Sequence, residues 1–286
     1  MAAAKGGPRI TSTRGFIDAA FKQPVEKGFF YAYRGHKTED YEVLPSILRS
    51  SQGRQQERRI LQELLATSSN EFQSDSNAFQ KLVRAQHYGL PTRLLDVTLN
   101  PLVALFFATE NLTDDEINEE YSPTGEVVVF KIPWERVKYS DSDAVSCIAN
   151  LSYMNYRERR ELRILGKPEK AAYNDQPVVD RLRQFIRAEK PGFRPEIEPK
   201  EIRSVYFVNP RDSNNRMIAQ AGKFLIYGER VGYANVTSEF DVKVFKISGG
   251  YKDSIRSQLD LLSINGRTLF PEVESAAKYI KAKFLS

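Results

Sequence analysis

The sequence is poor in cysteine and histidine, and this excludes several kinds of site. Cys147 is the only cysteine among 286 residues, and there are two histidines. A single thiol forms no internal disulfide, and a usual zinc site takes four ligands drawn mostly from Cys and His. We therefore expect a reducing, cytoplasmic environment and no metal. The neighbours of Cys147 are mostly Ala, Val and Ile, which favours a small buried hydrophobe over a nucleophile.

Long apolar runs and several nucleotide-binding or catalytic motifs are also missing. The longest apolar stretch covers residues 101–108, far short of the roughly 20 residues of a membrane-spanning helix. Residues 1–8 contain no apolar segment of the kind found in a signal peptide. The patterns G-x-S-x-G, G-x-x-x-x-G-K-[ST] and G-x-G-x-x-G do not occur, which excludes the usual nucleophile elbow, P-loop and Rossmann turn. We expect no membrane partner.

What is present fits one large domain. The hydrophobic content is 41%, with 17 Phe and 14 Tyr, which is enough apolar volume for a single core. We expect an N-terminal extension over residues 1–25 and a single domain over 26–286, with a helical, basic insertion at about 151–190. With ten Lys or Arg against six Asp or Glu, the insertion carries +4 of the net charge of +5. It is either a solvated face or a contact surface for a nucleic acid or an acidic protein.

Hydrophobic periodicity predicts an α+β fold. An aromatic run between glycines predicts a strand over 28–35 with Arg34 at its end. Gly89 is placed to close a helix as a left-handed residue, and Asn100 before Pro101 is a typical start of a buried helix. We expect helices over 57–66, 79–86, 101–110, 252–263 and 272–284, helical structure in 151–190, and strands over 127–132, 205–208, 223–227 and 242–247. The strand over 127–132 shows little alternation and is expected in the middle of its sheet.

Polar and charged side chains crowd the segment that leads into the buried helix. They are Gln86, His87, Tyr88, Thr92, Arg93, Asp96, Thr98 and Asn100, all within fifteen residues. A helix N-terminus carries about half a positive charge, so its free amides and nearby arginines bind anions. Arg34 precedes Gly35, where a missing side chain would let a ligand approach the backbone. Because a guanidinium grips phosphate in a fork, we predict a phosphate or diphosphate site here.

Several of these residues have a structural alternative that the sequence leaves open. Arg93 and Asp96, three residues apart, could pair with each other instead of binding a ligand. His87 could be a core histidine with satisfied partners, and Gln86 could cap a backbone group. The density of Arg, His, Gln and Thr in this segment favours a binding site over plain packing.

Several segments closely resemble the FRG-domain family. They are Tyr33-Arg34-Gly35, the Leu-Pro-Ser-Ile-Leu-Arg run at 44–49, and residues 85–96, 100–108, 216–224 and 269–274. The resemblance covers nearly the whole chain from about residue 26. One departure is Tyr33, where the motif that names the family has phenylalanine. The family's activity is poorly defined, so the resemblance identifies the site and leaves the reaction open.

The order of the elements is also similar to the ADP-ribosyltransferase plan. That plan has a strand ending in Arg-Gly, then a Thr-containing turn before an apolar helix, and later a strand with a polar residue near its start. The resemblance implies a mixed central sheet split around a polar cleft, with NAD as substrate. It implies that Arg34 holds a phosphate of NAD, that Thr98 supports the nicotinamide ribose and that Gln220 binds the ribose 2′-hydroxyl.

Two functions follow from these resemblances. As an ADP-ribosyltransferase or NAD glycohydrolase, the protein would bind the diphosphate over Arg34, Arg93 and the helix start at Asn100, and transfer ADP-ribose to a macromolecule or to water. Such an activity suits a bacterial toxin or antiphage effector. The expected catalytic residues are Arg34, His87, Asp96, Thr98 and Gln220, and the expected NAD contacts are Arg34, Gly35, Gln86, Tyr88, Thr92, Arg93 and Asn100.

Gln220 stands where the plan has a glutamate, and an amide supplies no negative charge. Either another carboxylate, such as Asp96, does this work, or the protein is a non-catalytic nucleotide- or nucleic-acid-binding module.

Overall fold

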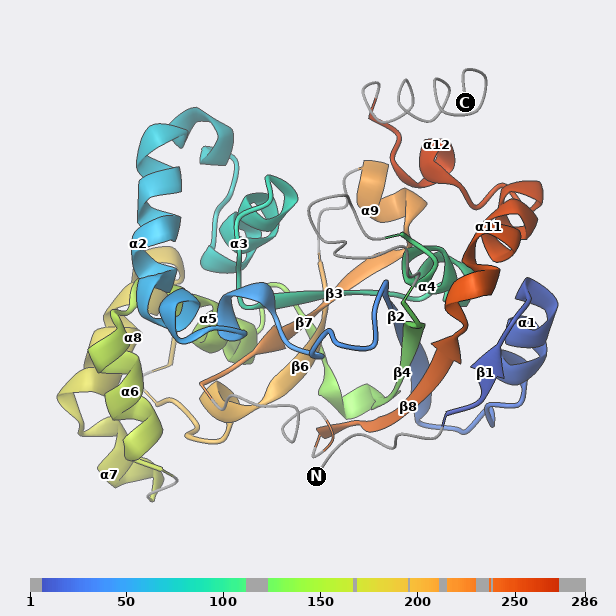
Figure 1. Ribbon diagram of the computed structural model, residues 1–286. Coiled ribbons are helices and arrows are strands. Elements are labelled where there is room, and N and C mark those ends of the chain that lie inside the picture. The colour runs from blue at the N-terminus through green and yellow to red at the C-terminus, as the bar shows by residue number, and fades with distance from the viewer. Residues whose placement is uncertain are drawn as a thin grey trace.

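A mixed sheet runs through the centre of the computed structural model, which describes residues 7–111, 123–166, 169–194, 196–210, 215–229, 237 and 239–272 (Figure 1). Within these residues the sheet has eight strands in the order β1-β8-β4-β2-β3-β7-β6-β5. The pairs β1–β8 and β5–β6 are parallel, and the other neighbours are antiparallel. The strands are β1 Arg9–Ile10, β2 Phe29–His36, β3 Leu94–Thr98, β4 Gly125–Pro133, β5 Val137–Tyr139, β6 Val205–Asn209, β7 Gly222–Tyr227 and β8 Asp241–Ile247. The predicted mixed α+β fold is confirmed.

The helices gather at the two ends of this sheet. They are α1 Thr13–Phe21, α2 Ser51–Thr67, α3 Ala78–His87, α4 Pro101–Ala108, α5 Asp143–Asn150, α6 Tyr156–Ile164, α7 Lys170–Asn174, α8 Pro177–Glu189, α9 Asn215–Ala219, α11 Lys252–Leu261 and α12 Gly266–Leu269. Helices α2, α3 and α5 to α8 lie on the left of the sheet in Figure 1, and α1 and α11 lie on the right near β1 and β8. Helix α4 is an exception, because it packs against β2 and β4. None of the helices in the described ranges has the length and apolar content needed to cross a bilayer.

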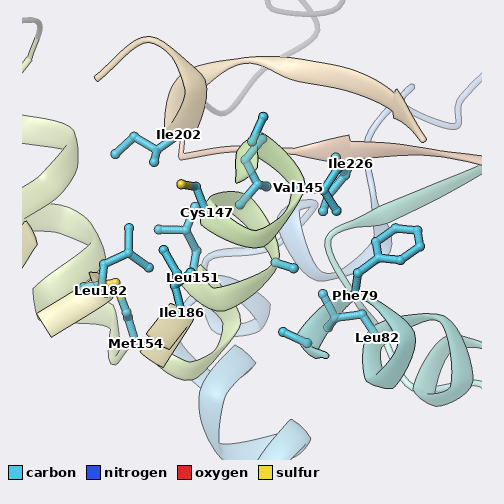
Figure 2. Packing of buried hydrophobic residues seen from close by; sticks show 14 of the residues in the cluster. Phe79, Leu82, Val145, Cys147, Leu151, Met154, Leu182, Ile186, Ile202 and Ile226 are labelled. Carbon is cyan, nitrogen blue, oxygen red and sulfur yellow. The ribbon is translucent and has the colours of Figure 1, made fainter. Parts of the chain in front are cut away.

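Among the residues that the structure describes, buried side chains form three clusters against the sheet. Figure 2 shows part of the largest, in which Phe79 and Leu82 of α3 lie near Val145 of α5 and Ile226 of β7. Cys147 is fully buried in the same cluster, and burial raises the pKa of its thiol. This confirms that Cys147 is a small core residue, because a thiol without solvent access and with a raised pKa is a poor nucleophile.

The N-terminal segment packs into another of these clusters. The two residues of β1 pair with β8, and Phe16 of α1 packs edge-on against Phe245 with no exposed surface. Part of the predicted N-terminal extension is therefore built into the domain. The predicted helix over 272–284 lies, apart from Glu272, outside the described residues.

The sequence correctly predicts where α3 ends and where β4 lies in the sheet. Gly89 has a φ of +84°, its N–H donates to the Gln86 carbonyl at 2.9 Å, and the N–H of Leu90 donates to the Ala85 carbonyl at 3.0 Å. These two bonds form a Schellman motif that ends α3, as predicted. Strand β4 lies between β8 and β2, which confirms its expected interior position.

Strands β2 and β3 separate almost as soon as they meet. Strand β2 pairs with β4 along its full length, and β3 pairs with β7 through all its residues. In the described chain, β2 and β3 share one register position, Tyr33 opposite Thr98. The sheet therefore opens between β2 and β3 beyond Tyr33, and several of the predicted site residues lie around this opening.

Candidate functional site

A cleft of about 330 Å³ lies where β2 and β3 separate. Both Tyr33 and Arg34 line it, and neighbouring residues of a strand point to opposite faces of a sheet. The cleft therefore reaches both faces of the sheet through the opening. Seven of the predicted site residues line it, namely Arg34, Gly35, Gln86, His87, Asp96, Thr98 and Gln220.

Arg34 spans the opening. Its Nη1 donates to the backbone carbonyl of Asp96 at 2.6 Å, where a regular sheet would have a backbone hydrogen bond. The same nitrogen lies 3.9 Å from the Asp96 carboxylate, and the arginine side chain is 19% exposed. Burial lowers the pKa of Arg34, and the negative charge of Asp96 opposes that shift. The cleft thus holds a largely desolvated guanidinium beside a carboxylate that is 66% exposed.

His36 is a residue of the cleft that the sequence analysis missed. Its Nε2 accepts a hydrogen bond from Nε of Arg34 at 2.9 Å, so its ring is neutral and carries its proton on Nδ1. Burial, together with the charges of Arg34 and Arg49, lowers the pKa of His36 to about 3. Strand alternation could have found it, because residues two apart in a strand share a face.

Helix α4 fills the space beside the backbone of Gly35. A Cβ at this position would overlap the carbonyl of Ala104 and approach the backbone nitrogen of Ala108 to 2.7 Å. Glycine therefore allows α4 to pack directly on β2. This corrects the expectation that the missing side chain gives a ligand access to the backbone.

Thr98 and Gln220 both line the cleft, and both also stabilise the fold. The Thr98 hydroxyl donates to the Gln220 carbonyl at 2.6 Å and accepts from the N–H of Asn100 at 3.0 Å. The Gln220 side-chain Nε2 donates to the Leu269 carbonyl at 3.0 Å. These bonds tie the start of β7 to the end of β3 and to α12.

His87 and Gln86 end α3 at the rim of the cleft. His87 is exposed, which excludes the alternative of a core histidine. Gln86 is half-buried, and its Oε1 accepts a hydrogen bond from the Thr92 hydroxyl. Thr92 is buried, lies outside the cleft, and also accepts from the N–H of Leu94 at 3.1 Å. Thr92 thus fixes the turn after α3 and is corrected from a ligand contact to a structural residue.

Arg93 is also corrected, because it lies in the interior away from the cleft. Its side chain is fully buried, and its Nε and Nη2 donate to the two carboxylate oxygens of Glu57 at 2.7 and 2.8 Å. Nη1 donates to the Tyr227 carbonyl at 3.0 Å, and Nη2 lies 3.3 Å from Glu229. Arg159 pairs with Glu57 as well. Arg93 therefore neither pairs with Asp96 nor reaches a phosphate in the cleft.

The start of α4 offers no free amide to an anion. The Asn100 Oδ1 accepts from the N–H of Leu102 at 2.9 Å, so the predicted cap is confirmed. The N–H groups of Val103 and Ala104 both donate to the Asn100 carbonyl, at 3.1 and 3.3 Å, and Pro101 has no N–H. The predicted contact of Asn100 with a diphosphate is therefore corrected.

Tyr88 is not among the residues that line the cleft. It is 55% exposed, and its hydroxyl donates to Glu71 at 2.8 Å.

The basic stretch at 151–190 exposes fewer of its charged side chains than its composition suggests. Arg157 and Arg160 are exposed, but Arg159 is only 3% exposed and belongs to the interior ion pairs.

The fold and the cleft together define a mixed α+β protein with charged side chains at a break in its central sheet. The model of the FRG domain family matches residues 30–116 of the chain, which supports the family resemblance over that range. The matched range contains Arg34, His36, His87, Asp96 and Thr98, whereas Gln220 lies beyond it. No curated protein and no solved structure matches the chain. The resemblance to ADP-ribosyltransferases stays a prediction.

Proposed function

We propose that the cleft binds NAD, cleaves the bond between nicotinamide and ribose, and passes the ADP-ribose to a macromolecule or to water. The observation that supports this most is the position of the Arg34 guanidinium 3.9 Å from the exposed carboxylate of Asp96 in one cleft. A guanidinium suits a phosphate of NAD, and a carboxylate suits the sugar that becomes positively charged. Consumption of NAD would fit the predicted role of a toxin or antiphage effector.

The reaction breaks the C1′–N bond, and nicotinamide leaves with the electron pair of that bond. Positive charge then develops on C1′ and the ring oxygen, where a fixed carboxylate is worth several kcal/mol of transition-state stabilisation. An oxygen of the acceptor bonds to C1′ and gives its proton to a base. The exposed imidazole of His87 at the rim of the cleft is our candidate for that base.

Asp96 is our candidate for the carboxylate that Gln220 lacks. It lines the same cleft as Arg34 and Gln220, and its side chain is open to solvent and hence to a ligand. Glu110, two residues after α4, also lines the cleft and is the second candidate. The absence of a carboxylate at position 220 therefore does not exclude this chemistry.

A non-catalytic nucleotide-binding module is the second candidate function. It is favoured by the hydrogen bonds that Thr98 and Gln220 make within the protein, since these occupy groups that the catalytic plan assigns to the ribose. Such a module would need the phosphate contact of Arg34 and no carboxylate.

Release of nicotinamide by the purified protein distinguishes the two functions. We expect wild-type protein to release nicotinamide from NAD, and Asp96→Asn to lower the rate by about 10²- to 10³-fold while NAD still binds. Arg34→Lys should raise KM, because lysine cannot form the two-pronged contact. Asp18→Asn, an exposed change on α1, is the control and should change neither value. If wild-type protein binds NAD without releasing nicotinamide, it is the binding module. If it does not bind NAD, the proposed enzyme function is wrong.

A further inference from the structure

Lys223 lines the cleft from the side opposite to Arg34. It is the second residue of β7, is partly buried, and pairs in register with Val97 of β3. It lies outside the range that matches the FRG domain, and its charge is not required by the reaction described above.

Within the described residues, Lys223 has no hydrogen bond, ion pair or aromatic partner for its ammonium group. The other cations differ in this respect, since Arg34 contacts His36 and Asp96, and the Arg216 guanidinium lies 4.7 Å from the centre of the Phe270 ring. Burial lowers the pKa of Lys223, which means that its charged form loses hydration without compensation. An anion bound in the cleft would offset this loss.

Arg34 and Lys223 lie on one face of the sheet. Tyr33 and Thr98 are opposite each other and share a face, so the next residues, Arg34 and Val97, share the other face. Lys223 is opposite Val97 and therefore also lies on that face. The two cations thus flank Val97 from the strands on either side of β3. Two long side chains that start on the same face of the sheet can converge on a ligand that lies over Val97.

We propose that Arg34 and Lys223 form a two-cation site for a diphosphate group, so that the cleft selects ligands with two linked phosphates over monophosphates. This inference rests on the proposed function in naming NAD as such a ligand. Each cation takes one phosphate, and the linkage makes the second contact intramolecular. In NAD this site would hold the diphosphate between the two nucleosides.

Calorimetric titration with inorganic pyrophosphate and with inorganic phosphate tests the site without a nucleotide. We expect wild-type protein to bind pyrophosphate more tightly than phosphate. Lys223→Gln should weaken pyrophosphate binding by about tenfold or more, as expected for loss of a charge-assisted contact, and should change phosphate binding much less. Lys223→Arg should keep the preference, and Lys243→Gln, an exposed change on β8, should leave both affinities unchanged. Pyrophosphate affinity that is the same in Lys223→Gln and wild type, or equal losses for both anions, overturns the inference.

A parallel comparison of NAD with nicotinamide mononucleotide separates this inference from the proposed function. Both compounds contain the bond that would be cleaved, but the mononucleotide has one phosphate. We expect Lys223→Gln to raise KM for NAD and to leave the mononucleotide unaffected. If Arg34→Lys impairs NAD cleavage and Lys223→Gln does not, the site is wrong and the function stands. If no nicotinamide is released but the pyrophosphate preference depends on Lys223, the function is wrong and the site stands.

Discussion

The imidazole of His36 accepts a hydrogen bond from Nε of Arg34, two residues earlier in the same strand, at 2.9 Å. This bond uses one edge of the guanidinium and leaves Nη1 directed at the Asp96 carbonyl. It also requires a neutral imidazole, since a protonated ring would place two donors against each other. His36 is thus the residue that orients Arg34 in the cleft.

The first prediction concerns the pH dependence of stability. The pKa of His36 is about 3 in the folded protein and about 6.5 when it is unfolded, so the unfolded state binds more protons between these values. The contribution of neutral His36 is fully present above pH 6.5 and is lost as the pH falls towards 3, by up to about 1.4 kcal/mol per pH unit. Urea unfolding at pH 7, 6 and 5 should show this slope in wild type and a smaller slope in His36→Gln. His87→Gln is the control, and its slope should match that of wild type.

The second prediction uses the acceptor that Arg34 requires. His36→Gln supplies an amide oxygen in place of the imidazole nitrogen and should keep NAD affinity near that of wild type. His36→Leu leaves Nε of a largely buried guanidinium without a partner, which costs about 1–3 kcal/mol and frees the side chain to rotate. We expect weaker NAD binding for His36→Leu by equilibrium titration. Equal affinities in the two variants would show that His36 does not orient Arg34.

The parts of the site that the sequence predicted are those set by local chemistry. The cap at Asn100 and the end of α3 at Gly89 each depend on residues within one turn of helix. Arg34 and Asp96 were placed in one site because their segments carry recognisable motifs. Their distance was not predictable, because it depends on how β2 and β3 diverge.

The errors at Arg93 and Gly35 arise from contacts between distant parts of the chain. The sequence predicts a phosphate contact for Arg93, but its partners Glu57 and Glu229 lie 36 residues before it and 136 after it. Nothing near Arg93 in the sequence indicates that these carboxylates will enclose it. The predicted ligand access at Gly35 is wrong for the same reason, because the local sequence gives no sign that α4 packs directly against β2.

The third prediction concerns these interior ion pairs. Glu57 pairs with both Arg93 and Arg159, and all three are nearly inaccessible to solvent. Glu57→Gln leaves the two arginines with Glu229 as their remaining carboxylate and should lower the free energy of unfolding by about 3–5 kcal/mol. Glu63→Gln on the exposed side of α2 is the control in the same urea titration. A loss below about 1 kcal/mol for Glu57→Gln would mean that the network contributes little.

The fourth prediction tests the basic stretch as a contact surface. The double variant Arg157→Gln and Arg160→Gln removes exposed charges of α6 and should leave NAD handling unchanged. If the stretch binds nucleic acid, affinity for a DNA duplex should fall and the salt slope should decrease by about 1 to 2. Arg58→Gln with Arg59→Gln makes the same charge change on exposed positions of α2 and is the control. An unchanged affinity and slope would identify the stretch as a solvated face.

The last prediction concerns Gln220, whose side-chain Nε2 donates to the Leu269 carbonyl. Gln220→Glu replaces that donor by a carboxylate, so we expect a loss of stability of about 1 kcal/mol. In a catalytic cleft the added negative charge lies near the sugar that becomes positive, and nicotinamide release should be kept or raised. In a cleft that only binds phosphates, the same charge should repel the ligand and weaken affinity. Gln220→Ala, which loses the amide without gaining charge, separates the two effects, because it shares the lost hydrogen bond and not the electrostatic change. Gln220→Glu protein that binds NAD as wild type does, yet releases no nicotinamide, would rule out the enzyme and leave the binding module.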